Sequence, residues 1–447
     1  MNEIERRLEE LDQLGLRRSL RMVSGPQGPR VLLDGRPVLM LCSNNYLGLA
    51  DHPRVREAAA EAAMRWGVGA GASRLVSGTM TVHRRLEERI ATFHRSESCV
   101  LFGSGYLANA GAIGALAGRG DALFSDELNH ASIVDGCRLS RAEVHVYRHR
   151  DLEHLEWLMH RHAGGRSGRD RAGQVIVSDS VFSMDGDLAP LEGIVELAQA
   201  YGARTIVDEA HAIGVLGPGG RGALAHAGLE GEVDVVVGTL GKALGSYGAY
   251  ACASDSTIDF LINAARPLIF STAPPPPAVA GAFAALEILE ERPHRVQRLR
   301  SNARVLRRAL AREGFPIADV EMHIVPVIAG EERAALALCE EILRQGVFAQ
   351  AIRPPTVAPG TSRLRLATMA SHTAEELTAA AHTIGRAART LGLDPAAMGL
   401  PERATDVEEP VQEDELRVPS FAEPVRASAR ASRPFDLERE PSVSRAA

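Results

Sequence analysis

The sequence is almost without lysine. Lysine and arginine together number 50 in 447 residues, and every one of them except Lys242 is arginine. A guanidinium stays protonated, so arginine cannot replace lysine where a primary amine must act as a nucleophile. A codon bias that spared one lysine would also explain the count. The retained amine makes Lys242 the first candidate for a catalytic residue.

Other scarcities exclude whole classes of protein. The five cysteines are dispersed without a Cys-x-x-Cys pair, which is typical of reduced thiols and not of a disulfide framework or a cysteine metal site. No apolar run approaches the roughly 20 residues that span a bilayer, and the charged first residues are unlike a signal peptide. The net charge of −7 is mild, so nucleic acid and membranes are not expected partners. We expect a cytoplasmic protein without a metal.

The pattern of apolar segments predicts an α/β fold. An amphipathic helix is expected over 3–20, a hairpin around Asp34, and a second helix over 53–66. From about residue 80 to 280, helices alternate with short apolar strands, which predicts a large domain with a mostly parallel sheet covered by helices. The expected strands of this sheet are 99–102, 122–124, 175–178, 205–207, 233–237 and 249–253.

Changes in pattern and composition divide the chain into four regions. We expect an N-terminal helix with short strands over 1–50, a large domain over 51–280, a smaller C-terminal α/β domain over 281–393 and a disordered tail over 394–447. One long helix over 278–314 is expected to connect the two domains. In the small domain we expect strands near 323–328 and 363–367 and a helix over 332–345. The tail is rich in Pro, Glu, Arg, Ser and Ala, and it buries too little apolar surface to offset its ordering entropy.

Polar residues follow the predicted strands, at the edge where open α/β sheets bind ligands. Asp208 ends one strand, and His211 comes three residues later. A carboxylate at this place suits the pyridinium nitrogen of pyridoxal phosphate, and His211 is close enough to contact the same ring. The alternative is that Asp208 caps the next helix and that His211 is structural. Together with Lys242, the acid favours a pyridoxal phosphate site.

Two further segments offer groups for this cofactor. The stretch Phe102-Gly103-Ser104-Gly105-Tyr106 passes from a strand through a glycine turn into a helix, and backbone N–H groups at such a helix start bind phosphate. Ser183 and Thr239 offer hydroxyl groups. His130 follows another strand, where its ring either stacks on the cofactor or caps a helix.

The sequence resembles the α-oxoamine synthases, a family of fold-type I pyridoxal-phosphate enzymes, over about residues 1–393. The motifs that carry the resemblance are Ser43-Asn44-Asn45-Tyr46-Leu47-Gly48-Leu49, Asn129-His130-Ala131-Ser132, Val181-Phe182-Ser183-Met184-Asp185-Gly186-Asp187, Val207-Asp208-Glu209-Ala210-His211 and Gly238-Thr239-Leu240-Gly241-Lys242-Ala243. The resemblance implies that Lys242 forms a Schiff base with pyridoxal 5'-phosphate and later acts as a base. It also implies that Asp208 pairs with the ring nitrogen and that His130 stacks on the ring and assists the acyl step.

The resemblance implies further contacts. Residues that match other cofactor-binding positions are Gly105, Tyr106, Ser183, His211, Thr239 and Thr272, the last of which would reach the phosphate of a partner subunit. Residues that match substrate-binding positions are Arg21, Asn44, Ser73, Thr356 and Arg365. A homodimer is expected because sites of the family form at a subunit interface.

Members of the family condense an amino acid with an acyl thioester and release CO₂ and the thiol. The match over residues 126–150 favours the branch that joins L-alanine to pimeloyl-CoA, or to a pimeloyl acyl-carrier protein, in biotin biosynthesis. Ser73 stands where glycine-using members tend to carry threonine, and the smaller side chain leaves room for the methyl group of alanine. The alternatives are a member with another amino acid or acyl donor, such as glycine with acetyl-CoA, and a non-catalytic binding or scaffold relative. Relatives of the last kind usually lose the lysine.

Overall fold

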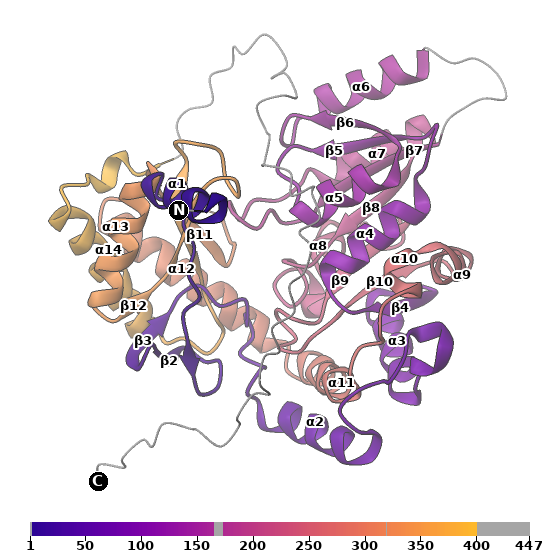
Figure 1. Ribbon diagram of the computed structural model, residues 1–447, viewed down its shortest axis with the longest axis horizontal. Helices are drawn as coiled ribbons and strands as arrows, with labels where there is room; N and C mark the ends of the chain where they lie inside the picture. Colours follow the sequence, from indigo (N-terminus) through magenta and orange to yellow (C-terminus); the bar gives the residue numbers. More distant parts are fainter. Residues whose placement is uncertain (1, 165–172, 319, 400–447) are drawn as a thin grey trace. The chain divides into compact units, whose positions relative to one another are not determined.

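A computed structural model describes residues 2–164, 173–318 and 320–399 (Figure 1). The described residues continue past 393, where the tail was expected to begin. Asp394 caps a short 3₁₀ turn, η3 (Pro395–Ala397), and Met398 is buried. The rest of the expected tail, 400–447, lies outside the described residues.

The larger lobe is built around a seven-stranded sheet, with strand order β4-β10-β9-β8-β7-β5-β6. Neighbouring strands from β9 to β6 are parallel, whereas β10 runs antiparallel to both β4 and β9. The strands are β4 (Ser98–Phe102), β5 (Ala122–Asp126), β6 (Glu143–Tyr147), β7 (Gln174–Asp179), β8 (Arg204–Asp208), β9 (Val235–Thr239) and β10 (Ala249–Ala253). The predicted fold class is confirmed. Strand β6 was not among the predicted strands, because Glu143 and His145 interrupt its apolar run.

Helices cover both faces of this sheet (Figure 1). Alternate strand residues point to opposite faces. Leu101 and Val207 join one buried core with residues of α3 and α11, and Val100 and Ile206 join another with residues of α4 and α9. The helices of this lobe are α2 (Pro53–Trp66), η1 (Arg74–Gly78), α3 (Thr81–His94), α4 (Gly105–Leu116), α5 (Ala131–Ser140), α6 (Leu152–Gly164), α7 (Leu191–Tyr201), η2 (Pro218–Gly220), α8 (Ala223–Ala227), α9 (Asp255–Ala264), α10 (Arg266–Ile269) and α11 (Pro276–Glu291).

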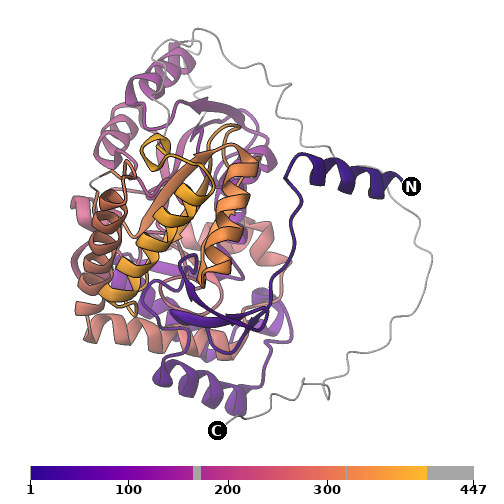
Figure 2. The same ribbon diagram turned by 90° about the vertical axis from the view of Figure 1, so that its left-hand side faces the viewer.

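The smaller lobe, in orange and yellow in Figure 2, contains an antiparallel sheet of three strands in the order β11-β14-β13. These strands are β11 (Ile324–Gly330), β13 (Gln350–Ile352) and β14 (Ser362–Ala367), and the helices are α12 (His294–Arg312), α13 (Glu332–Arg344) and α14 (Ala374–Thr390). The N-terminal strands β1 (Val23–Ser24), β2 (Arg30–Leu33) and β3 (Arg36–Met40) continue into a parallel pairing with β12 (Val347–Phe348). The start of the chain therefore shares a sheet with its C-terminal part.

Two helices differ from their predicted lengths. Helix α1 (Glu3–Gln13) ends before Gly15, whose φ of 66° lies in the left-handed region, whereas the prediction extended it to residue 20. The single helix predicted over 278–314 is two helices, α11 and α12, which are divided at Pro293. Proline has no N–H group and clashes with the preceding turn, so the helix cannot continue through it. Within the described ranges, no helix is long and apolar enough to cross a membrane.

The parallel strands bring their polar ends to one edge of the sheet. Strands β5, β7 and β8 end in Asp126, Asp179 and Asp208, and β9 ends in Thr239. Because these strands run in the same direction, the residues that follow them gather at the edge where ligands bind in α/β sheets.

Candidate active site

Lys242 lies in the loop that follows β9. The hydroxyl of Thr239 holds this loop: it accepts a hydrogen bond from the N–H of Gly241 at 3.2 Å and donates one to the carbonyl of Gly248 at 3.2 Å. The Nζ atom of Lys242 lies 2.7 Å from Nε2 of His211. The structure thus brings together three of the residues that the sequence analysis singled out.

The surroundings of Lys242 favour its neutral amine. Burial lowers the pKa of Lys242 to about 8; Asp208 and Asp179 oppose this shift, and the cation of Arg365 adds to it. Burial also lowers the pKa of His211 well below its usual value, and the charges of Lys242 and Arg365 act in the same direction. His211 is therefore a neutral imidazole near pH 7.

A chain of polar contacts leads from His211 to the smaller lobe. Nδ1 of His211 lies 2.7 Å from the hydroxyl of Tyr46, which is fully buried. Arg365 of β14 donates hydrogen bonds to this hydroxyl at 3.3 Å, to Oδ1 of Asn44 at 3.2 Å and to the carbonyl of Ser183 at 2.5 Å. Three contacts, through His211 and Tyr46, therefore link the lysine amine to a buried guanidinium.

Asp208 is buried at the end of β8. Its carboxylate accepts hydrogen bonds from the side chain of Asn109 at 2.6 Å and from the N–H of Ala210 at 2.7 Å. Asp179 occupies the matching position of β7, and burial together with the charge of Asp208 raises the pKa of Asp179 well above its usual value. Asp208 and Asp179 are neighbouring buried acids, and such a pair favours a positively charged group beside it. The pair therefore fits a protonated pyridine ring.

The ring of His130 caps helix α5. Its Nδ1 lies 2.7 Å from the hydroxyl of Ser132 and accepts the N–H of Ser132 at 3.2 Å, so the helix-capping alternative of the sequence analysis is realised. Because Nδ1 already accepts this N–H, it carries no proton, and the Ser132 hydroxyl, which also accepts a hydrogen bond from Asn109 at 2.9 Å, donates its own proton to His130. Nδ1 is thus the acceptor, and Nε2 of the neutral ring carries the proton. Burial lowers the pKa of His130, Asp208 opposes this, and Lys242 adds to it, so the neutral form prevails near pH 7.

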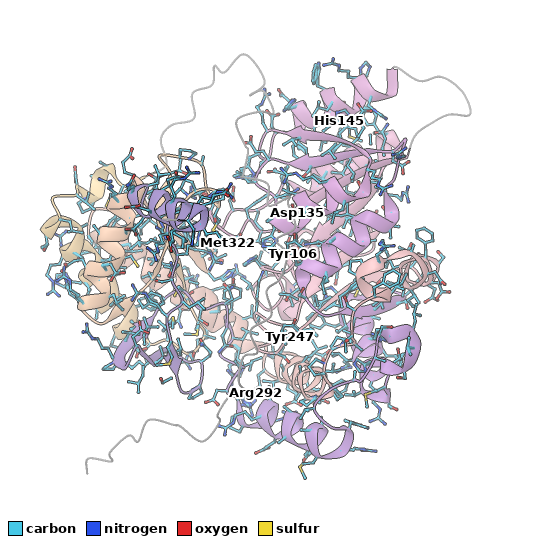
Figure 3. All side chains as sticks on the ribbon, in the orientation of Figure 1. Tyr106, Asp135, His145, Tyr247, Arg292 and Met322 are labelled. Carbon is cyan, nitrogen blue, oxygen red and sulfur yellow. The ribbon has the colours of Figure 1, made fainter. Side chains whose placement is uncertain are left out.

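The start of α4 fits a phosphate group. Helix α4 begins at Gly105, directly after β4, and Ser104 caps it by accepting the N–H of Leu107. The N–H groups of Gly105 and Tyr106 have no partner within the described chain and remain free for an anion. The hydroxyl of Tyr106 donates to Asp135 of α5, and Figure 3 shows the two labelled residues close together.

Four predicted residues lie outside this group of contacts. Arg21 forms ion pairs with Asp34 and Glu340. Thr356 is exposed in the loop between β13 and β14. Ser73 and Thr272 form an isolated β-bridge with each other, next to η1. Their predicted roles remain predictions.

The structure adds residues that the sequence analysis did not select. Tyr46 links His211 to Arg365, Asn109 and Ser132 link Asp208 to His130, and Asp179 holds the backbone N–H of His130 at 2.7 Å. Tyr46 and Ser132 stand inside the motifs quoted above, which was the available signal. The signal for Asp179 was its place directly after the predicted strand 175–178.

Comparison with known proteins agrees with this geometry. Residues 36–384 match the model of the aminotransferase class I and II family. The 8-amino-7-oxononanoate synthase of Citrifermentans bemidjiense is 52% identical over 379 residues, which cover 84% of this chain and 96% of the relative. That of Anaeromyxobacter dehalogenans is 52% identical over 370 residues, which cover 83% of this chain and 91% of the relative.

Solved structures of related enzymes share the fold. A serine palmitoyltransferase variant from S. paucimobilis with a bound PLP–myriocin adduct superposes with a TM-score of 0.82 at 31% identity, covering 88% of this chain and 98% of that chain. The 8-amino-7-oxononanoate synthase of Francisella tularensis superposes with a TM-score of 0.68 at 25% identity, covering 80% and 99%. The chain therefore belongs to the aminotransferase class I and II family and, among the fold-type I enzymes that use pyridoxal phosphate, to the α-oxoamine synthases.

Proposed function

We propose that this protein is a pyridoxal-phosphate-dependent acyltransferase that condenses L-alanine with a pimeloyl thioester, giving 8-amino-7-oxononanoate, CO₂ and a free thiol for biotin biosynthesis. Curated relatives named 8-amino-7-oxononanoate synthase are about half identical to this chain over most of its length. The observation that carries the chemistry is the only lysine amine of the sequence, 2.7 Å from His211 at the ligand-binding edge of the sheet.

The residues fit the cofactor in three places. Lys242 would bind its aldehyde, Asp208 would face its ring nitrogen, and the first N–H groups of α4 would hold its phosphate. Ser183, His211 and Thr239 would add contacts around it. When bound, pyridoxal phosphate supplies the electron sink that stabilises negative charge at the Cα atom of the amino acid.

Arg365 and Lys242 would act on the amino acid from two sides. The guanidinium of Arg365 binds the carboxylate of alanine, with Asn44 beside it, and this fixes which bond of Cα faces the cofactor. The amine of Lys242, with its pKa lowered to about 8, then takes the Cα proton as a general base. Because the alanine carboxylate and the Lys242 amine are both held in place, proton removal becomes effectively unimolecular.

His130 would act on the acyl donor. Because Ser132 occupies Nδ1, the N–H of Nε2 can donate a hydrogen bond to the thioester carbonyl as Cα attacks it. The C–S bond then breaks and the thiol leaves, and the amino-acid carboxylate departs as CO₂. Arg21, Ser73 and Thr356 remain proposed substrate contacts, and the carrier of the acyl chain is CoA or an acyl-carrier protein.

We further propose a homodimer that works in the cytoplasm. All five cysteines are unpaired, which suits a reducing compartment. Thr272 would complete the phosphate site of the partner subunit. An enzyme that joins glycine to acetyl-CoA has the same catalytic groups, so substrate choice is the property to test.

The test is release of free thiol by the purified holoenzyme. L-alanine, glycine and L-serine are each combined with pimeloyl-, acetyl-, succinyl- and palmitoyl-CoA, and Lys242→Arg serves as the inactive control. We expect thiol release with alanine and pimeloyl-CoA alone. A best rate with glycine and acetyl-CoA would move the enzyme to the sibling reaction, and no release with any pair, together with no cofactor absorbance, would contradict catalysis.

A further inference from the structure

Two histidines and a glutamate gather at the outer edge of the large sheet. Glu143 and His145 lie on the same side of the edge strand β6, and His162 lies in the last turn of α6. One nitrogen from each ring and one carboxylate oxygen all lie within 4.8 Å of one another. Specifically, Nε2 of His145 is 3.4 Å from Oε1 of Glu143, and Nδ1 of His162 is 4.0 Å from Oε2 of the same carboxylate.

One nitrogen of each ring, Nε2, has no hydrogen-bond partner among the described residues. Nε2 of His145 and Nε2 of His162 are buried and make no hydrogen bond with the described residues. The His162 side chain is only 7% exposed. A buried polar atom without a partner costs roughly 1–3 kcal/mol. The unpartnered atom of His145 is the one that lies nearest Glu143, so it needs an explanation; in His162 the atom nearest Glu143 is Nδ1.

Packing holds both rings in position. Phe124 of β5 stacks on His145, with ring centroids 5.2 Å apart, and meets His162 edge-on at 6.2 Å. His162 follows Leu155 and Met159 along the buried face of α6. These contacts limit rotation of both rings, and Nε2 of His145 and Nδ1 of His162 are the atoms nearest Glu143.

The geometry suits a transition metal ion. Tetrahedral zinc with bonds of about 2.0–2.1 Å has neighbouring ligand atoms roughly 3.3 Å apart, so the His145–Glu143 distance already fits and His162 needs a small shift. Two imidazoles with one carboxylate favour zinc over magnesium or calcium, which prefer oxygen alone. The expected absence of a metal rested on the dispersed cysteines, whose spacing does not bear on histidine ligands.

We propose that Glu143, His145 and His162 form a binding site for Zn²⁺ or a similar divalent transition metal ion, with water as the fourth ligand. The ion joins the edge strand β6 to the end of α6. Glu143 begins β6, and the catalytic residues follow the carboxyl ends of the parallel strands, so the ion occupies the opposite end of the sheet. Figure 3 shows the labelled His145 well apart from Tyr106 and Tyr247. The site therefore stabilises the fold without entering the reaction.

The test uses untagged holoenzyme from which metal has been removed with a chelator. Adding Zn²⁺ at about 100 times its Kd should raise Tm by about 2 °C or more, because the ion binds only the folded chain. Titration calorimetry should show one zinc per chain. Binding of Co²⁺ should give the visible bands of a tetrahedral site. The activity of the loaded and unloaded enzyme should be equal.

Three variants make the assignment specific. His162→Gln should weaken zinc binding at least about tenfold and abolish the rise in Tm. Glu143→Gln changes an exposed side chain, so it keeps the test valid if the His162 variant does not fold. His160→Gln alters an exposed histidine of the same helix outside the cluster and should bind zinc like the parent. Absence of a Tm rise in the parent, or an equal rise in the Glu143 and His162 variants, would overturn the proposal.

Discussion

Lys242 holds an amine that is partly neutral near physiological pH. Burial lowers its pKa to about 8, although two acids lie near it. The pair Asp208 and Asp179 limits the shift, because a carboxylate favours the charged ammonium. Burial and the two carboxylates act in opposite directions on this pKa. The result is a pKa within about one unit of neutral pH, where the amine exists both as a cation and as a free base.

This shift predicts how the cofactor is loaded. When pyridoxal phosphate is added to the apoenzyme, the rate of Schiff-base formation should rise with pH and reach half its maximum near pH 8, since only the neutral amine reacts. Stopped-flow absorbance measures the rate. A midpoint near 10.5, the ordinary value for lysine, would contradict the prediction.

The single lysine gives this experiment a clean control. After reduction with borohydride, the cofactor should be attached to the one peptide that contains Lys242, because no other lysine exists in the chain. Lys242→Arg should show no attachment and no turnover, while its far-ultraviolet circular dichroism stays that of the parent. Attachment elsewhere would show that the loading rate does not report on Lys242.

Ser132 sets the proton position of His130. Its hydroxyl accepts from Asn109 and donates to Nδ1, which leaves the proton on Nε2. Ser132→Ala should lower kcat about tenfold, because one hydrogen bond of about 1–1.5 kcal/mol is lost while the backbone N–H of residue 132 still reaches the ring. The steady-state rate of thiol release measures the effect, and KM for alanine should change little.

Two variants separate this effect from general damage. Ser132→Thr retains a hydroxyl and should restore most of the activity. Ser140→Ala removes a buried hydroxyl from the same helix, where it donates to the carbonyl of Cys137 and accepts the N–H of Ala142, and should leave kcat unchanged. An equal loss in the Ser140 variant would mean that α5 is merely destabilised.

At the scale of elements, His149 connects the end of a strand to a turn. Its Nδ1 lies 2.9 Å from Asp126, the last residue of β5, and its Nε2 lies 2.8 Å from Asp187, in the turn that follows Ser183. Burial opposes protonation, but the two carboxylates together raise the pKa of His149 to about 9. The imidazolium is therefore a fixed positive charge that joins the end of β5 to the Ser183–Asp187 turn.

This charge predicts a pH-dependent contribution to stability. The folded pKa of about 9 exceeds the ordinary value of 6.5, so the contribution is complete below pH 6.5 and is lost as pH rises through 9. Its full size is on the order of 3 kcal/mol, from a shift of 6.5 to about 9. His149→Gln should therefore lower the free energy of unfolding most below about pH 6.5 and least above about pH 9.

Urea unfolding of the parent and the variant at several pH values measures this difference. His154→Gln is the matched control, because His154 accepts only the N–H of Arg148 and its pKa is lowered by burial, with Arg148 adding to the shift. The change in the free energy of unfolding caused by His154→Gln should not disappear at high pH. A His149 effect that is constant across the range would show that the ring is neutral in the folded protein.

The strands that carry the site could be predicted from the sequence, but the contacts between site residues distant in the sequence could not. Continuous apolar runs ended by Asp208 and Asp179 mark buried parallel strands, and one lysine among many arginines marks the catalytic loop. Tyr46 and Arg365 lie 319 residues apart, and only the folded chain shows that they touch. Strand β6 was missed because its inner face carries Glu143 and His145 in place of apolar residues, and those residues form the proposed metal site.

At the scale of the whole molecule, one surface carries exposed apolar side chains beside a predicted site. Val76 in η1 is 80% exposed, and Leu75 is exposed beside it. This segment directly follows Ser73, which bridges Thr272. Thr272 is the residue that would reach the phosphate of a partner subunit. Apolar exposure next to such a residue fits a surface that a second copy of the chain covers.

Charge placed on this surface should therefore separate the subunits and weaken the cofactor site together. Val76→Asp should shift the protein from dimer to monomer in sedimentation velocity, because a carboxylate cannot be buried in an apolar interface without a partner. The monomer should bind pyridoxal phosphate more weakly, at least about tenfold, since Thr272 of the partner no longer reaches it. Val146→Asp, on the outward face of β6, also changes an exposed valine and should leave both properties unaltered. A Val76 variant that remains a dimer would show that η1 lies outside the subunit interface, and a monomer that binds the cofactor as tightly as the parent would show that each site is complete within one chain.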